Sequence, residues 1–194
     1  MTAVVFDVGE TLVDETHLWE RLADEARVPR FTLMGVLGGL AARGEPHQRA
    51  WDLLGAEAPD DPGAPGGSDF YDDALPCLGA LRTAGYRLGA AGNMPESFER
   101  ALQAHVDFTG SSHRWGVEKP DPAFFERVIA DAGEPPAHIA YVGDRVDNDV
   151  IPAAEAGMVA VHVRRGPWGL LHDPPPGTPQ VDSLEEVPEL LRDV

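Results

Sequence analysis

Short apolar runs alternate along this chain with longer segments in which apolar residues recur every three or four positions. The runs at residues 3–6, 88–91, 139–142 and 159–163 are bounded by turn residues, which is typical of buried strands. The helical spacing predicts helices over 18–26, 31–40, 50–54, 73–85, 95–105, 121–133, 147–157 and 183–191. Strands that alternate with helices favour a Rossmann-like α/β fold, with a parallel sheet and helices on both faces.

Residues 14–68 interrupt this alternation directly after the first strand. The segment holds three stretches with helical spacing, and residues 56–68 are so rich in Pro, Gly and Asp that they cannot bury an apolar face. We therefore expect an α/β core made of residues 1–13 and 69–194, with residues 14–68 as a small helical insertion.

Composition narrows the classes of partner. The chain has 194 residues, 43% hydrophobic and 25% charged, as in ordinary globular proteins. Its formal net charge of −18 disfavours nucleic acids and anionic membranes, which both need a basic surface. Cys77 is the only cysteine, and no apolar run approaches about 18 residues, so we expect a soluble, cytoplasmic protein. Nothing in the sequence indicates an oligomeric state.

Candidate chemistry lies at the predicted strand ends. Asp7 follows the first strand, Asp144 follows the strand at 139–142, and Asp149 lies one turn later. Lys119 is the only lysine beside 14 arginines, which indicates a position where the planar guanidinium would not serve. Carboxyl ends of parallel strands meet at one edge of the sheet, so these groups are expected to converge there. Such a group could bind Mg²⁺ through carboxylates and supply a nucleophile, although each residue alone could equally be a cap or a surface charge.

Four segments resemble the motifs of the haloacid dehalogenase-like hydrolase superfamily. FDVGETL is similar to the first motif and LGAAGN to the second, while GVEKPDPAFF and YVGDRVDNDVIPAAEAGM closely match the third and fourth. The resemblance implies a catalytic nucleophile at Asp7 with Lys119 balancing charge. It also implies phosphate binding by Gly92, Asn93 and Lys119. A metal site is implied at Asp7, the Gly9 carbonyl, Asp144 and Asp149, and residues 14–68 would be the helical cap of the family.

Two positions depart from the family pattern. Gly9 stands where phosphatases of the family usually carry an Asp that acts as general acid and base, and Gly92 stands in place of a Ser or Thr. Glu10 or Asp14 could replace the missing acid, or could be solvated loop acids. If no group replaces it, substrates whose leaving group departs as an anion should be favoured over alkyl phosphates, because acid–base help is worth about 10²–10⁴ in rate.

The sequence therefore predicts a Mg²⁺-dependent phosphatase that acts on a small phosphate monoester through an aspartyl-phosphate on Asp7. Two alternatives stay open at this point. One is a dehalogenase or another non-phosphatase hydrolase, which Gly9 favours and the full metal set opposes. The other is a non-catalytic protein that binds metal or phosphate, which the departures at Gly9 and Gly92 favour.

Overall fold

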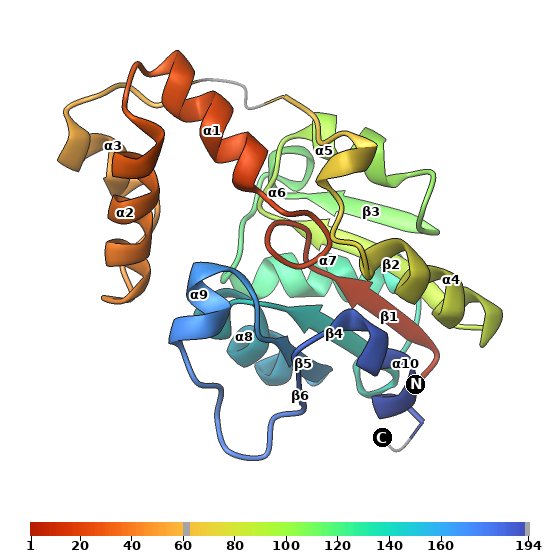
Figure 1. Ribbon diagram of the computed structural model, residues 1–194. Helices are drawn as coiled ribbons and strands as arrows, with labels where there is room; N and C mark the ends of the chain where they lie inside the picture. The colour runs from red at the N-terminus through yellow and green to blue at the C-terminus, as the bar shows by residue number, and fades with distance from the viewer. Residues whose placement is uncertain (60–62, 193–194) are drawn as a thin grey trace.

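A computed structural model describes residues 1–59 and 63–192, and its centre is a six-stranded parallel sheet (Figure 1). The strand order is β3-β2-β1-β4-β5-β6, which places β1 between β2 and β4. The strands are β1 (Ala3–Phe6), β2 (Arg87–Gly92), β3 (Phe108–Ser111), β4 (Ile139–Gly143), β5 (Val159–Val163) and β6 (Gln180–Val181). The predicted α/β class with a parallel sheet is confirmed.

Helices cover both faces of the sheet because successive residues of β1 point to opposite sides. Val4 and Phe6 pack in one apolar cluster with α4 (Ala74–Thr83), α5 (Glu96–Leu102) and α10 (Val187–Leu190). Ala3 and Val5 pack in the other cluster, with α7 (Pro122–Ala132) and α8 (Ile151–Glu155). Every residue of β1 is buried, so the strand that precedes Asp7 is held from both sides.

Three helices follow β1 and stand beside the sheet, on the side to which the β1 arrow points (Figure 1). They are α1 (Thr16–Glu25), α2 (Arg30–Ala41) and α3 (Arg49–Leu54). Helix α9 (Gly166–Leu171) contacts α2, and His172 Nε2 lies 2.7 Å from the Ala41 carbonyl oxygen. Residues 60–62 of the predicted loop 56–68 lie outside the described residues.

Several elements differ from the sequence-based expectation. The strands β3 and β6 and the helices α6 (Ser112–Trp115) and α9 were not predicted. Helix α5 ends at Leu102 rather than at 105. The segment 146–150 forms a π-helical turn, which we label η3 (Val146–Val150), ahead of α8.

Asp73 is the residue before α4, but its side chain does not cap the helix. The Asp73 carboxylate does not bond the α4 backbone and instead accepts hydrogen bonds from Ser183 Oγ at 2.8 Å and Leu184 N at 2.9 Å. It also pairs with Arg165. Asp73 therefore fastens α4 to the C-terminal segment.

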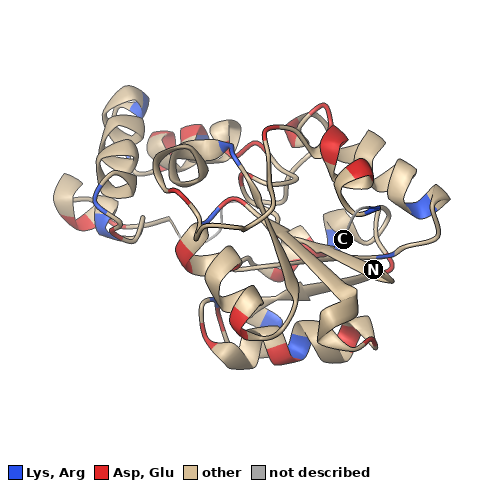
Figure 2. Cartoon of the chain, turned by 90° about the horizontal axis from the view of Figure 1, so that it is seen from below, with Lys and Arg blue, Asp and Glu red and all other residues tan. Residues whose placement is uncertain are grey.

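Acidic positions are distributed over helices and loops around the sheet (Figure 2). Among the described residues, no helix combines the length and the apolar character needed to cross a membrane.

Candidate active site

Three buried carboxylates meet where the central strands end. Asp7 follows β1, and its backbone N–H donates to the Val142 carbonyl at 2.8 Å, which continues the β1–β4 ladder. Asp144 follows β4, and Asp149 lies in η3 with its side chain fully buried. One oxygen from each carboxylate can be chosen so that all three lie within 4.8 Å of one another.

Lys119 is buried between two of these carboxylates. Its Nζ donates to Asp7 Oδ1 at 2.6 Å and to Asp149 Oδ1 at 2.5 Å. Burial opposes the charged form of the lysine, but the Asp149 and Asp7 charges outweigh it and hold the Lys119 pKa well above its usual value. The lysine therefore stays protonated and neutralises part of the negative charge of the site.

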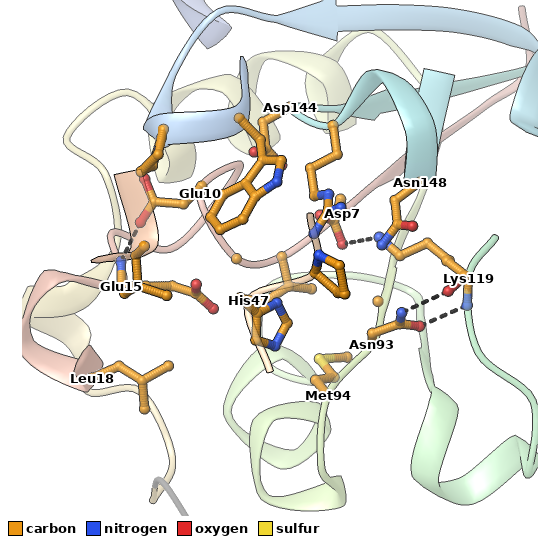
Figure 3. Close-up of a pocket in the computed structure, with 18 of the residues that line it drawn as sticks. Asp7, Glu10, Glu15, Leu18, His47, Asn93, Met94, Lys119, Asp144 and Asn148 are labelled. Carbon is orange, nitrogen blue, oxygen red and sulfur yellow. Dashed lines mark hydrogen bonds and ion pairs between the residues drawn. The ribbon is translucent and has the colours of Figure 1, made fainter. Parts of the chain in front are cut away.

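Asn93 positions Lys119 rather than pointing freely into the cavity. Its Oδ1 accepts the Lys119 backbone N–H at 2.8 Å, and its Nδ2 donates to the Lys119 carbonyl at 3.0 Å (Figure 3). These two bonds join the end of β2 to the loop that carries the lysine.

The carboxylates are crowded. Burial, followed by the charges of Asp149 and Asp7, raises the pKa of Asp144 well above its ordinary value. Burial and the neighbouring Asp7 raise the pKa of Asp149 to about 6. The Asp149 carboxylate is also oriented from behind, because its Oδ2 accepts the Arg145 backbone N–H at 3.0 Å. The site therefore carries more negative charge than the one lysine neutralises.

The two glycines of the predicted site both face carboxylates. A Cβ atom on Gly92 would lie 2.7 Å from Asp7 Oδ1, and a Cβ atom on Gly9 would lie 2.3 Å from Glu15 Oε1. Contacts under 3.0 Å require something to move, so neither position accepts a side chain with these carboxylates in place.

Of the acids near Gly9, Glu15 is the one whose carboxyl group reaches it. Glu10 accepts the Glu15 backbone N–H at 3.0 Å and the Tyr71 hydroxyl at 2.7 Å. Asp14 accepts the Thr16 backbone N–H at 2.8 Å and is not among the residues that line the cavity. Burial, followed by the charges of Glu10 and Asp7, raises the pKa of Glu15 to about 8. Glu15 was not among the predicted site residues, and its only signal in the sequence is an acid shortly before the helix predicted over 18–26.

The carboxylates open into a cavity of about 680 Å³. One end is formed by Asp7, Lys119 and Asp144 (Figure 3), and the other by apolar side chains of α1 and α2. His47, between α2 and α3, and Trp168, in α9, also line the cavity. Their ring centroids lie 6.3 Å apart.

Comparison with known proteins agrees with this geometry. A family model described as haloacid dehalogenase-like hydrolase matches residues 1–157. The chain belongs to the haloacid dehalogenase-like hydrolases.

Relatives within this family carry phosphatase names. The phosphoglycolate phosphatase of Rhodospirillum rubrum is 31% identical over 198 residues, which cover 84% of this chain and 80% of the relative. The glyceraldehyde 3-phosphate phosphatase of Methanopyrus kandleri is 36% identical over 104 residues, which cover 50% of this chain and 45% of the relative. This chain thus spans about half the length of the M. kandleri protein and, at 57%, little more of its Methanocaldococcus jannaschii counterpart.

Solved structures of the haloacid dehalogenase-like family share the fold. A phosphatase of this family from Thermococcus onnurineus has a TM-score of 0.66 at 21% identity, with 98% of each chain covered. The L-2-haloacid dehalogenase of Xanthobacter autotrophicus has a TM-score of 0.67 at 20% identity, with 99% of each chain covered. The fold thus accommodates both phosphatases and dehalogenases and does not by itself determine the chemistry.

Proposed function

We propose that this protein is a Mg²⁺-dependent phosphatase that hydrolyses a small phosphate monoester through an aspartyl-phosphate on Asp7. The observation that carries the proposal is the Asp7 carboxylate, held by Lys119 at 2.6 Å at the end of a cavity that a small substrate can enter. The phosphatase names of the relatives from R. rubrum and M. kandleri support the same reaction class.

Asp7 would attack the phosphorus atom, and the bond between phosphorus and the ester oxygen would break. Lys119 would balance the charge of Asp7 and of the transferring phosphoryl group, as a fixed cation in a site that excludes water. The Gly92 backbone N–H and the second Asn93 amide hydrogen would donate to phosphoryl oxygens. Water would then release phosphate and regenerate the Asp7 carboxylate, which splits one difficult step into two.

The donor set fits Mg²⁺. Three carboxylates with oxygens within 4.8 Å are hard ligands. Burial and repulsion between neighbouring carboxylates raise the pKa values of Asp144 and Asp149, and a divalent cation would offset that repulsion. Asp7, the Gly9 carbonyl and Asp144 would hold the ion, and Asp149 would orient its surroundings. When bound, Mg²⁺ would stabilise the negative charge that develops on the phosphoryl group.

Helices α1–α3, within residues 14–68, would act as a cap over this centre. Their apolar side chains line the far end of the cavity, and the contacts with α9 join them to the core. The substrate would therefore be recognised between the cap and residues 1–13 and 69–194.

A panel of phosphate monoesters and 2-haloacids, assayed with and without Mg²⁺, tests the proposal. Phosphate release that requires Mg²⁺ and disappears in Asp7→Asn is expected. Halide release without Mg²⁺ would establish the dehalogenase alternative, and Mg²⁺ binding without turnover of any substrate would leave a binding protein.

A further inference from the structure

The Glu15 carboxyl group occupies the space into which a side chain at residue 9 would project. A Cβ atom on Gly9 would lie 2.3 Å from Glu15 Oε1 and 2.7 Å from Glu15 Cδ. Gly9 does not have a positive φ, so the backbone does not require glycine at this position. Gly9 and Glu15 are therefore complementary, since the missing side chain of one admits the carboxyl group of the other.

The Glu15 carboxyl group is fixed at this location. Trp19 Nε1 donates to Oε2 at 3.2 Å, and the Glu15 backbone N–H is bound by Glu10. Figure 3 shows the Glu15 side chain reaching into the cavity that Asp7 also lines. Among the described residues, no hydrogen bond ends on Glu15 Oε1, which leaves this oxygen available to a substrate.

On the basis of the proposed phosphatase function, we propose that Glu15 is the general acid and base of the reaction. As Asp7 attacks phosphorus and the P–O ester bond breaks, the Glu15 carboxyl proton passes to the departing alkoxide and gives the alcohol. In the second step the Glu15 carboxylate takes a proton from water as its oxygen bonds to phosphorus, and Asp7 leaves as a carboxylate. The sum is ester plus water giving alcohol plus phosphate, with Glu15 protonated again.

Glu15→Gln tests this role, because the amide keeps the shape but cannot transfer the proton. With butyl phosphate, kcat is expected to fall by about 10²–10⁴. With nitrophenyl phosphate, whose phenolate leaves without a proton, the first turnover should persist as a burst of one nitrophenolate per enzyme. Phosphorylated Asp7 should then accumulate and be detected by mass, because its hydrolysis lacks a base.

The double variant Gly9→Asp/Glu15→Ala should regain most of the butyl phosphate turnover, because it returns a carboxyl group to the same space. Asp14→Asn is the matched control and should keep wild-type rates, since the amide oxygen can still accept the Thr16 N–H. If Glu15→Gln turns over butyl phosphate at the wild-type rate, or shows no nitrophenolate burst, the role of Glu15 is overturned and the proposed phosphatase function is not. Absence of turnover of either ester by the wild type would instead overturn the proposed function, and the role of Glu15 with it.

A second inference comes from the charges of the cavity and is independent of Glu15. The cations among its described lining residues are Lys119 and Arg145, and both are paired: Arg145 Nη2 donates to Asp147 Oδ2 at 2.7 Å. Burial, with the Arg145 charge, lowers the pKa of His47 to about 4, so this ring is neutral at pH 7. If the substrate carried an anionic group besides its phosphate, that group would find no unpaired cation among the described residues that line the cavity.

A large part of the wall away from the carboxylates is apolar. This part is formed by Leu18, Leu22, Met34, Leu37 and Phe98. Again on the basis of the proposed function, we infer that the organic group of the substrate is uncharged and apolar, unlike glycolate, which the name of the R. rubrum relative contains. A site without partners rejects a charged group because that group loses its hydration.

The comparison of kcat/KM for butyl phosphate and phosphoglycolate tests this inference. Butyl phosphate is expected to exceed phosphoglycolate by about tenfold or more, which corresponds to about 1.4 kcal/mol. Met34→Arg, which places a cation on the cavity wall, should reverse part of this preference, whereas Phe31→Arg at a 90% exposed position of the same helix should not. A wild-type preference for phosphoglycolate would overturn the inference and leave the phosphatase function intact. Turnover of neither ester would count against the function itself.

Discussion

Gly9 and Gly92 each leave room for a carboxylate, and this explains two residues that depart from the family pattern. At Gly9 the space is taken by Glu15, and at Gly92 it is taken by Asp7 Oδ1. The sequence shows that glycine stands at these two motif positions. Which acidic side chain enters the vacated space depends on the path of residues 10–15, which spacing alone does not determine. Asp7 and Asp144 could be predicted to converge because each follows a strand end, and Asp149 lies one turn after Asp144. The motif match added Lys119, whereas no such signal pointed to Glu15.

Gly92→Ala is expected to lower kcat without unfolding the protein. The new Cβ would lie 2.7 Å from Asp7 Oδ1 and would push the nucleophile aside. A displacement on the order of 1 Å can cost about 10²-fold in rate. Steady-state assays with nitrophenyl phosphate measure the effect. Gly79→Ala, where a Cβ atom meets nothing within 4 Å, is the control. Unchanged activity in Gly92→Ala would show that Asp7 can move without consequence.

Lys119→Met is expected to abolish phosphate release, because Asp7 and Asp149 lose their shared cation. Breaking a buried pair by removing one partner costs about 3–5 kcal/mol, so urea unfolding should also show a loss of stability. Lys119→Arg should rescue activity poorly, since the guanidinium is larger than the space for an ammonium group. Arg100→Met on the exposed side of α5 controls for loss of a positive charge. Wild-type rates in Lys119→Arg would contradict the assigned role.

At the scale of elements, strands with continuous apolar runs were predictable, and strands without such a run were not. β3 (Phe108–Ser111) contains one large apolar residue, and its Gly110 packs under the Trp115 ring, where a Cβ atom would lie 2.0 Å from the indole. β6 has only two residues. β3 forms because β2 and α6 pack against it, and β6 forms because it pairs with β5, which is tertiary information absent from local spacing.

The start of α1 is held by a bond that joins two distant segments. Tyr71 donates to Glu10 at 2.7 Å, and Glu10 accepts the Glu15 N–H at 3.0 Å. Tyr71→Phe removes the first bond and should lower the free energy of unfolding by about 1.5–3 kcal/mol, since the acceptor is charged. It should also lower butyl phosphate turnover more than the nitrophenyl phosphate burst, because Glu15 is held less firmly. Tyr86→Phe, whose hydroxyl makes a 3.5 Å contact with Leu191, is the matched control. If Tyr71→Phe lowers the rates with both esters equally, the Tyr71–Glu10 bond does not support proton transfer by Glu15.

For the whole molecule, negative charge is the dominant electrostatic feature. The net charge is −18, and acidic positions occur on helices and loops around the sheet (Figure 2). The buried carboxylates of the site add to this repulsion. The cytoplasmic location stays a prediction of the composition. The charge has a direct consequence for stability, because the folded protein holds protons that the unfolded chain would release.

The stability of the metal-free protein is expected to fall as the pH rises from about 4 toward 8. Burial raises the pKa of Asp149 to about 6 and of Glu15 to about 8, whereas unfolded carboxyl groups release their protons near pH 4. Between these values the two carboxyl groups hold more protons in the folded state than in the unfolded state, so their contribution to stability decreases with each pH increase. Thermal melts of the metal-free protein at pH 5.5 and pH 8 measure this slope.

Mg²⁺ should reverse the trend, because it binds the deprotonated carboxylates and stabilises by RT ln(1 + [L]/Kd), about 2.7 kcal/mol at one hundred times Kd. The increase in Tm should therefore be larger at pH 8 than at pH 5.5, and NaCl of equal ionic strength should not reproduce it. Asp144→Asn should remove the Mg²⁺ increment yet leave the metal-free protein at least as stable as the wild type at pH 8, because one of three crowded buried charges is gone. A wild-type Tm that does not change with millimolar Mg²⁺ at pH 8 would contradict the metal site. The fold would then tolerate the three crowded carboxylates without a divalent cation.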